Sequence, residues 1–172
     1  MPFILHTLRI TRKPIFLSLL PFFPLILQAE ERSEWVKDSK TGCAVWNEYH
    51  ILNVTITWSG GCVGGKATGK GILQRYQEGK PSERYEGELK DGKKHGHGVS
   101  TWAEGRRYEG RYKDGHLHGR GVYTWPDGTR YEGEFKDGWQ HGRGVVTWAD
   151  GNRYEGESKN SEQHGRGVKT WA

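Results

Sequence analysis

Histidine and cysteine are the residues whose types and spacing in this sequence could support chemistry. Four of the eight histidines recur at intervals of 23 residues, namely His95, His118, His141 and His164. Such a column can hold a metal ion only if neighbouring repeats bring two rings within about 4 Å of each other. The two cysteines, Cys43 and Cys62, could form a disulfide or supply a reactive thiol.

The sequence lacks the common catalytic motifs. No serine lies in a Gly-x-Ser-x-Gly elbow, and no glycine-rich phosphate loop is present. The Gly-x-Gly pairs recur with the histidines and do not open a helix, as a nucleotide-binding motif requires. Glutamates such as Glu86 and Glu88 recur identically, whereas an enzyme site depends on one distinct constellation in a pocket. We therefore expect no catalytic residue, no cofactor and no metal site, although His95 with His97, or His116 with His118, could bind a metal weakly from one loop.

The histidines belong to a larger repeat. Tyr-Glu-Gly and a closing Thr-Trp recur at the same interval of 23 residues. A fixed period of this length indicates a repeat architecture, in which one small unit packs against its neighbours. The repeated positions that we expect to serve structure and interaction are Tyr85, Gly87, Trp102, Tyr108, Gly110, Trp125, Tyr131, Gly133, Trp148, Tyr154, Gly156 and Trp171.

Each repeat has the pattern of a β-hairpin. Residues 131–136 alternate between charged and uncharged side chains, which is typical of a strand. Asp137-Gly138 then predicts a turn, and residues 144–148 are β-branched and aromatic, like a second strand. Ala149-Asp150-Gly151 suits a type I turn followed by a left-handed glycine. The sequence therefore predicts an all-β fold, an elongated single-layer antiparallel meander of hairpins.

The two faces of such a sheet would differ in character. Gly133 shares a face with the tyrosines, and we expect aromatic rings to lie over its bare backbone. Arg130 and Glu132 lie on the opposite face, where opposite charges on neighbouring strands add only a few tenths of a kcal/mol per pair. That face is expected to be a solvated surface.

These units resemble repeats of the MORN (membrane occupation and recognition nexus) family, whose pattern is Y-x-G-x-x-x-x-G-x-x-x-G-x-G. One copy fills it with Tyr131, Gly133, Gly138, Gly142 and Gly144. The last copy departs from this pattern at Ser161, where glycine is expected. It also has Ser158 where the earlier copies have Leu, Tyr or Phe. The resemblance covers Trp58 to the C-terminus, with about five repeats, the first and last degenerate. In the first repeat Trp58 takes the place of tyrosine, because aligning it with Tyr85 also aligns the glycines that follow. The resemblance implies a module for assembly or attachment.

The chain begins with a segment typical of export. Residues 1–29 have a basic start and an apolar run from Pro14 to Leu27, and they end at Ala29, which predicts a signal peptide. An uncleaved anchor is the alternative, but the run is shorter than the roughly 20 residues of a spanning helix. Without this segment the chain has 23 basic and 21 acidic residues, interleaved in every repeat. A nucleic-acid partner would need a patch of one sign, so none is expected.

The remaining chain divides into three regions. Residues 30–57 are expected to form a leader and cap strand, residues 58–84 a degenerate first repeat with a longer loop at 77–83, and residues 85–172 four repeats of period 23. In an exported chain, Cys43 and Cys62 are expected to form a disulfide that fastens the cap over the first sheet edge. A catalytic thiol is the alternative. The cap sequence is similar to that of exported bacterial members of the family.

Two functions remain open from the sequence. The first is a non-catalytic exported scaffold that binds a protein partner or itself, because aromatic anchors favour interfaces. We expect a homo-oligomer, formed through the aromatic face or the C-terminal edge. The second is attachment to anionic lipid headgroups of a membrane or envelope. Either function would be carried out in the periplasm or outside the cell, including at the envelope.

Overall fold

The computed structural model describes residues 35–48 and 50–172 of the chain. The chain divides into two units, residues 1–31 and 32–172, and the described residues belong to the second. The predicted signal peptide, residues 1–29, lies outside the described residues. Among the residues that are described, no helix is long and apolar enough to span a membrane.

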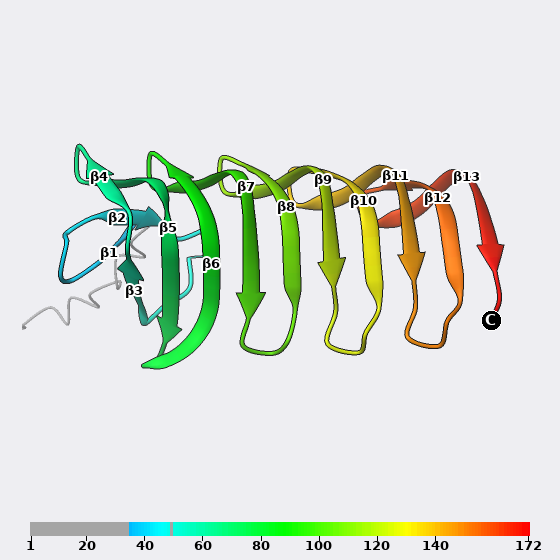
Figure 1. Cartoon of the computed structure of the whole chain (residues 1–172), viewed down its shortest axis with the longest axis horizontal. Coiled ribbons are helices and arrows are strands. Elements are labelled where there is room, and N and C mark those ends of the chain that lie inside the picture. Colours follow the sequence, from blue (N-terminus) through cyan, green and yellow to red (C-terminus); the bar gives the residue numbers. More distant parts are fainter. Residues whose placement is uncertain (1–34, 49) are drawn as a thin grey trace, which may run out of the picture. The chain divides into compact units, whose positions relative to one another are not determined.

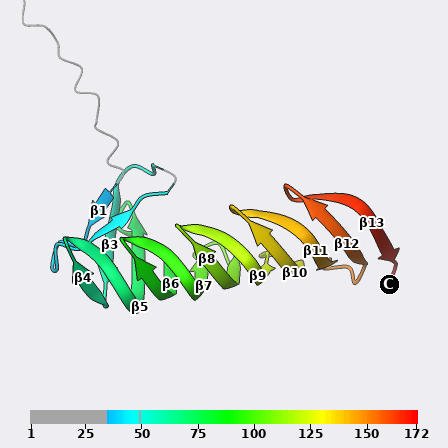
Figure 2. The ribbon, with the colours of Figure 1, turned by 90° about the horizontal axis from the view of Figure 1, so that it is seen from above.

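The described part of the chain forms one 13-stranded sheet and contains no helix, which confirms the all-β meander (Figure 1). From β5 to β13 the strands follow one another in chain order and pair antiparallel (Figure 2). The strands are β1 (Trp35–Lys37), β2 (Ala44–Trp46), β3 (Val54–Trp58), β4 (Gly61–Val63), β5 (Lys66–Gln77), β6 (Lys80–Lys90), β7 (Lys93–Trp102), β8 (Arg107–Lys113), β9 (His116–Thr124), β10 (Arg130–Lys136), β11 (Trp139–Thr147), β12 (Arg153–Lys159) and β13 (Glu162–Thr170).

Two kinds of turn alternate along the sheet, as predicted. Asp137 and Gly138 both have positive φ, 49° and 91°, which is the type I′ conformation favoured in two-residue hairpins. At the other end of the hairpins, the Gly128 N–H donates to the Trp125 carbonyl at 3.0 Å, and Gly128 is left-handed with φ 90°. In the last repeat Ser161 takes the glycine position with φ 65°, a conformation that costs a residue with a Cβ atom free energy.

The second strand of each hairpin is longer than the sequence predicted. In the repeat that begins at Tyr131, β11 begins at Trp139 rather than at Gly144. The register between β10 and β11 shifts after Gly133, and Gly142 is left-handed with φ 63°. The bulge arises because glycine tolerates this φ, so that pairing continues on both sides of it instead of ending there.

Two expectations about the N-terminal part are wrong. Residues 77–83 do not form a longer loop, because Glu78 and Gly79 make a tight turn and Pro81 pairs with Tyr76. The four extra residues lengthen β5 and β6 instead. Residues 35–37, expected in a flexible leader, form β1, which pairs with β2. In both places backbone pairing satisfies polar groups that a loop would leave to water.

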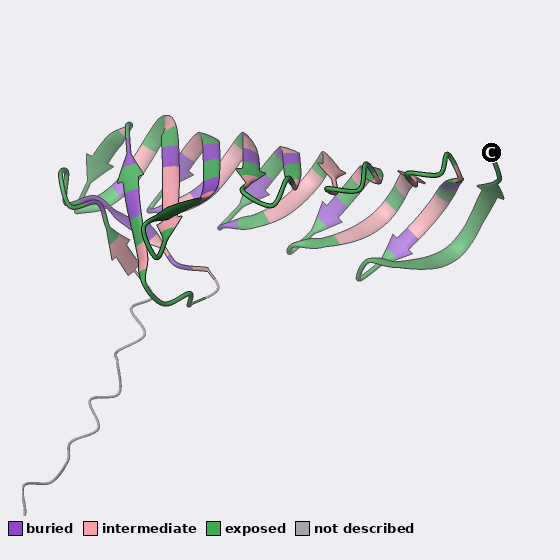
Figure 3. Cartoon of the chain, turned by 90° about the horizontal axis from the view of Figure 1, so that it is seen from below, coloured by how far each residue is buried: buried purple, intermediate pink, exposed green. Residues whose placement is uncertain are grey.

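The core lies on one face of the sheet, here called the tyrosine face because it carries Tyr85, Tyr108, Tyr131 and Tyr154. In Figure 3 the buried bands lie on β10 and β12 but not on β9 or β11, because the buried tyrosines come from the first strand of each hairpin. A Cβ atom added to Gly133 would lie 2.5 Å from the Tyr131 hydroxyl oxygen and 2.6 Å from the Gly144 Cα. The ring therefore lies over two glycines of paired strands, one of them on its own strand.

The same ring is also held by polar and aromatic contacts. The Tyr131 hydroxyl donates to the Glu134 carbonyl at 3.0 Å. The Phe135 ring meets the Tyr108 and Tyr131 rings edge to face, with centroids 5.1 Å from each. Such pairs contribute about 0.5–1.5 kcal/mol beyond the burial of area. This packing leaves Tyr131 with no exposed surface.

Replacing Gly133 by Val should destabilise the protein far more than replacing Glu132 by Val. The new side chain at Gly133 would collide with the Tyr131 ring, and overpacking of this kind costs about 1–3 kcal/mol. Glu132 is exposed, so its replacement should change stability by roughly 0.5 kcal/mol. Urea denaturation of both variants measures the difference, and equal losses would contradict this packing.

Candidate functional site

Residues 35–48 and 50–53, here called the cap, pack at the N-terminal end of the sheet. The Ala44 N–H donates to the Gly65 carbonyl and the Trp46 N–H to the Gly92 carbonyl, both at 2.8 Å. The cap therefore reaches beyond the first sheet edge, where the sequence placed it, and crosses the turns of the first two hairpins. It reaches still further at Glu48, whose carboxylate lies 2.9 Å from His116 Nδ1 on β9.

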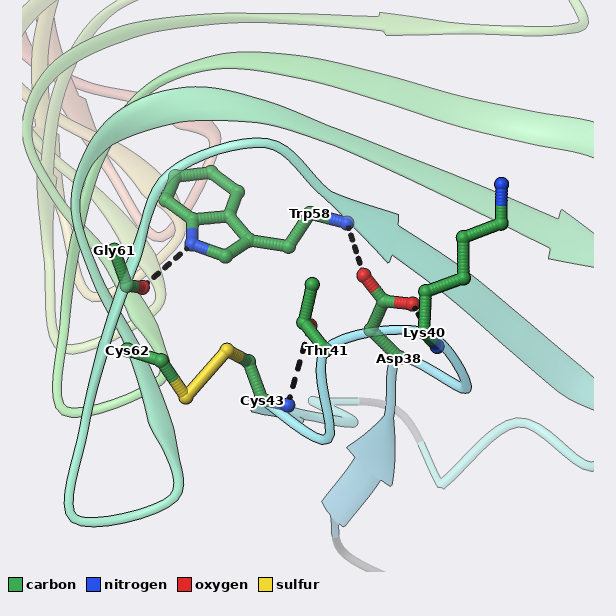
Figure 4. The surroundings of a disulfide bond; sticks show 7 residues. All are labelled: Asp38, Lys40, Thr41, Cys43, Trp58, Gly61 and Cys62. Carbon is green, nitrogen blue, oxygen red and sulfur yellow. Dashed lines mark hydrogen bonds between the residues drawn. A yellow bond between two sulfur atoms is a disulfide. The ribbon is translucent and has the colours of Figure 1, made fainter.

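A disulfide and a buried carboxylate fasten the cap (Figure 4). Cys43 and Cys62 are bonded, with their Cα atoms 5.7 Å apart. The Asp38 carboxylate accepts from the Trp58 N–H at 3.0 Å and from the Lys40 N–H at 2.9 Å. Burial raises the pKa of Asp38, but these backbone hydrogen bonds outweigh it and lower the pKa below its usual value. The cap is thus held at the outer edge of β3.

The first, degenerate repeat is built like the others. A Cβ atom added to Gly71 would lie 2.7 Å from the Trp58 ring, which also covers Gly60. Trp58 is almost fully buried, and its Nε1 donates to the Gly61 carbonyl at 2.8 Å. Trp58 therefore occupies the place that tyrosine holds in later repeats, as the alignment of the glycines predicted.

A buried polar cluster lies beneath the cap on the tyrosine face, and the sequence reasoning missed it. Glu83 forms ion pairs with Lys94 and, at 3.3 Å, with Arg75. The Ser100 hydroxyl donates to Glu83 at 2.8 Å and accepts from the Tyr112 hydroxyl at 2.9 Å. The sequence signal that could have revealed this cluster is a departure of one repeat from the pattern of the others.

That departure lies at two positions. Lys94 and Ser100 stand where the next repeat has Leu117 and Tyr123. A repeat that exchanges two apolar positions for polar ones must provide partners for them, because buried polar groups are costly without hydrogen bonds. Here the partners are Glu83 and Arg75, outside the repeated motif.

The charges of the cluster stabilise one another. Burial raises the pKa of Glu83, but the positive charges of Lys94 and Arg75 and hydrogen bonds from Lys94 and Ser100 outweigh it and lower the pKa. Burial raises the pKa of Glu48 above its usual value, opposed by Lys94 and His116. Because Ser100 is fully buried and Lys94 is 7% exposed, the cluster cannot meet a substrate. It links the sheet to the cap, since Arg75 donates to the Trp46 carbonyl at 2.7 Å.

The opposite face, here called the charged face, carries a groove of about 1430 Å³ that crosses the strands from β7 to β13. Its apolar lining comes from Val122, Val145 and Val168. Glutamate, arginine, glycine and His97 line the rest, and both signs of charge are present along the groove. These charged side chains are Glu109, Arg120, Glu132, Glu134, Arg143, Arg153, Glu155, Glu157 and Arg166.

The structure separates the predicted site residues into buried and accessible groups. The tyrosines at 85, 108 and 131 are fully buried, and Tyr154 is 6% exposed, so they support the fold and do not contact a partner. The tryptophans at 102, 125 and 148 are half-buried on the tyrosine face, whereas Trp171 is exposed. Trp125 packs on Tyr123, with ring centroids 4.6 Å apart.

The histidine column lies beside the hairpin turns. His118 Nδ1 lies 3.8 Å from the Asp137 carboxylate, and His95 lies 4.0 Å from Asp114 in the same way. Among the described residues, no three His, Cys, Asp or Glu side chains come together as a metal site.

A row of near-identical hairpins with a groove along one face defines an open repeat protein, in which binding surfaces extend over several units. The model of the MORN repeat family matches residues 85–105, 108–130, 131–153 and 154–172. The chain belongs to the MORN repeat family. A comparison with curated proteins finds no match for the chain.

Replacing Lys94 by Met should destabilise the protein by about 3 kcal/mol, because Glu83 loses a partner while it stays buried. Replacing the exposed Lys136 by Met is the matched control and should change stability by less than about 0.5 kcal/mol. Urea denaturation measures both. A loss at Lys94 no larger than at Lys136 would show that the cluster contributes nothing to stability.

Thiol titration of the exported protein, denatured without reductant, should find no free thiol. The disulfide closes a sequence separation of 19 residues, so replacing both cysteines by Ala should cost about 3 kcal/mol in the chain-entropy model. Reduction of the unaltered protein should lower the free energy of unfolding by a similar amount, which appears as a lower denaturation midpoint. Two free thiols per chain would refute the pairing.

Proposed function

We propose that the chain is a non-catalytic exported scaffold whose charged-face groove binds another polypeptide. The observation that carries this proposal is the groove itself, which passes over more than three repeats. Its lining repeats with the hairpins, so neighbouring repeats offer similar side chains at regular intervals. An extended partner uses such a surface well, whereas a small substrate needs one enclosed and distinct pocket.

We infer that the chain is non-catalytic from the location of the residues that do not recur from repeat to repeat. Among the described residues, the cluster of Glu83, Lys94 and Ser100 is a constellation that does not recur in other repeats, and it is buried. The accessible glutamates and arginines recur from repeat to repeat. Membership of a family of non-catalytic repeat modules supports the same conclusion.

Export and self-association belong to the proposal as well. Export is supported by the composition of residues 1–29 and by the disulfide between Cys43 and Cys62, since disulfides persist in oxidising compartments. Self-association is supported by the tyrosine face, where Trp125, Val146 and Trp148 remain half-buried. A second copy could cover this apolar surface.

A photoreactive amino acid placed at Val145, inside the groove, should cross-link the protein to a polypeptide in cells that export it. The same probe at Lys80, an exposed residue outside the groove, is the matched control and should give no specific adduct. Mass spectrometry identifies the adduct, and light scattering of the purified protein establishes whether it is a second copy. A lipid adduct at Val145 would instead support the alternative of attachment to membrane headgroups, and no adduct would overturn the proposal.

A further inference from the structure

Five charged side chains of alternating sign follow one another along the groove. Arg120, Glu134, Arg143, Glu157 and Arg166, here called the charge row, lie on the consecutive strands β9 to β13 and all line the groove. Arg120 is paired in register with Glu134, and Arg143 with Glu157. Among the described residues none of the five side chains forms an ion pair or a hydrogen bond. Their charges are therefore available to a partner.

The other acidic row of the charged face is already neutralised. Glu132 and Glu155 each lie 2.6 Å from the arginine two residues earlier, Arg130 and Arg153, and the Glu109 pair is at 2.7 Å. These glutamates face the valines of neighbouring strands, because Glu132 pairs with Val122 and Val145. The groove thus has a floor of low net charge next to the unpaired charge row.

The spacing of the charge row selects a backbone conformation for the partner. Like charges are two strands apart, which corresponds to about 9.4–9.8 Å across a sheet. A polyproline II helix rises about 3.1 Å per residue with three residues per turn, so its side chains repeat every 9.3 Å or so. The side chains on one face of an extended β-strand repeat about every 6.6 Å, which does not match.

We propose that the groove binds a partner polypeptide in the polyproline II conformation with charged residues at every third position. Acidic residues pair with Arg120, Arg143 and Arg166, since arginine binds carboxylates in a bidentate geometry. Basic residues beside them meet Glu134 and Glu157, while the third residue of each turn points away from the sheet, because the three side chains of a turn lie about 120° apart. The inference rests on the proposed function, because it names the class of polypeptide that this groove takes.

The test uses a synthetic peptide of four Glu-Lys-Pro units and a peptide of the same composition in which the period of three is scrambled. Isothermal titration with the purified protein at low ionic strength should give an affinity about ten-fold higher for the periodic peptide. The difference should shrink as salt is added, because exposed charge pairs are screened. Equal affinities would overturn the inference but would leave polypeptide binding in the groove intact.

Two variants locate the binding. Arg143→Gln should reduce the affinity for the periodic peptide about ten-fold. Lys136→Gln is the matched control, because Lys136 is an exposed cation on β10 that does not line the groove and neutralises none of its glutamates, and its effect should stay within about two-fold. Thermal denaturation verifies that both variants are folded. Equal effects of the two variants, or no binding of the periodic peptide, would overturn the inference, whereas the cross-linking experiment separately decides the proposed function.

Discussion

The fold depends on the packing of a tyrosine ring over two glycines of paired strands. In the third matched repeat the ring of Tyr131 lies over Gly133 and Gly144, and its hydroxyl donates to the Glu134 carbonyl. A side chain at either glycine would lift the ring from the backbone. The contact gives each hairpin a buried core of its own, with rings of the neighbouring repeats added edge to face. A sheet can therefore extend repeat by repeat without a second layer of protein.

This constraint also decides what the opposite face can do. Because the aromatic rings occupy the tyrosine face, the charged face carries the glutamates and arginines beside a narrow row of valines and remains in contact with water. Glu132 pairs with Arg130 on its own strand, whereas Arg143 in the bulge has no partner among the described residues. The bulge at each Gly-x-Gly thus separates neutralised charges from free ones. Because the bulge recurs in every repeat, the unpaired charges that it places in the groove recur as well.

The N-terminal hairpins differ from the later ones because their core contains buried charged groups. Here the cap covers the tyrosine face, and the core beneath it is polar where Glu83 and Lys94 meet. The pair survives burial because Arg75 and Ser100 supply further partners. The carboxylate of Glu48 extends the contact to His116 on the next hairpin. The cap is bound by specific polar contacts as well as by the disulfide between Cys43 and Cys62.

The sequence by itself determined the all-β class, the hairpin as the repeating unit and the face that holds the tyrosines, because periods of 2 and 23 depend only on residue order. It also determined that Trp58 replaces a tyrosine, through the matching glycines. Only the tertiary structure decided that Glu83 meets Lys94 beneath the cap, and that Arg120, Arg143 and Arg166 share one groove. The three arginines recur every 23 residues, but whether residues aligned in this way line one groove depends on register, bulges and chain crossings, which follow from the packing of many residues together.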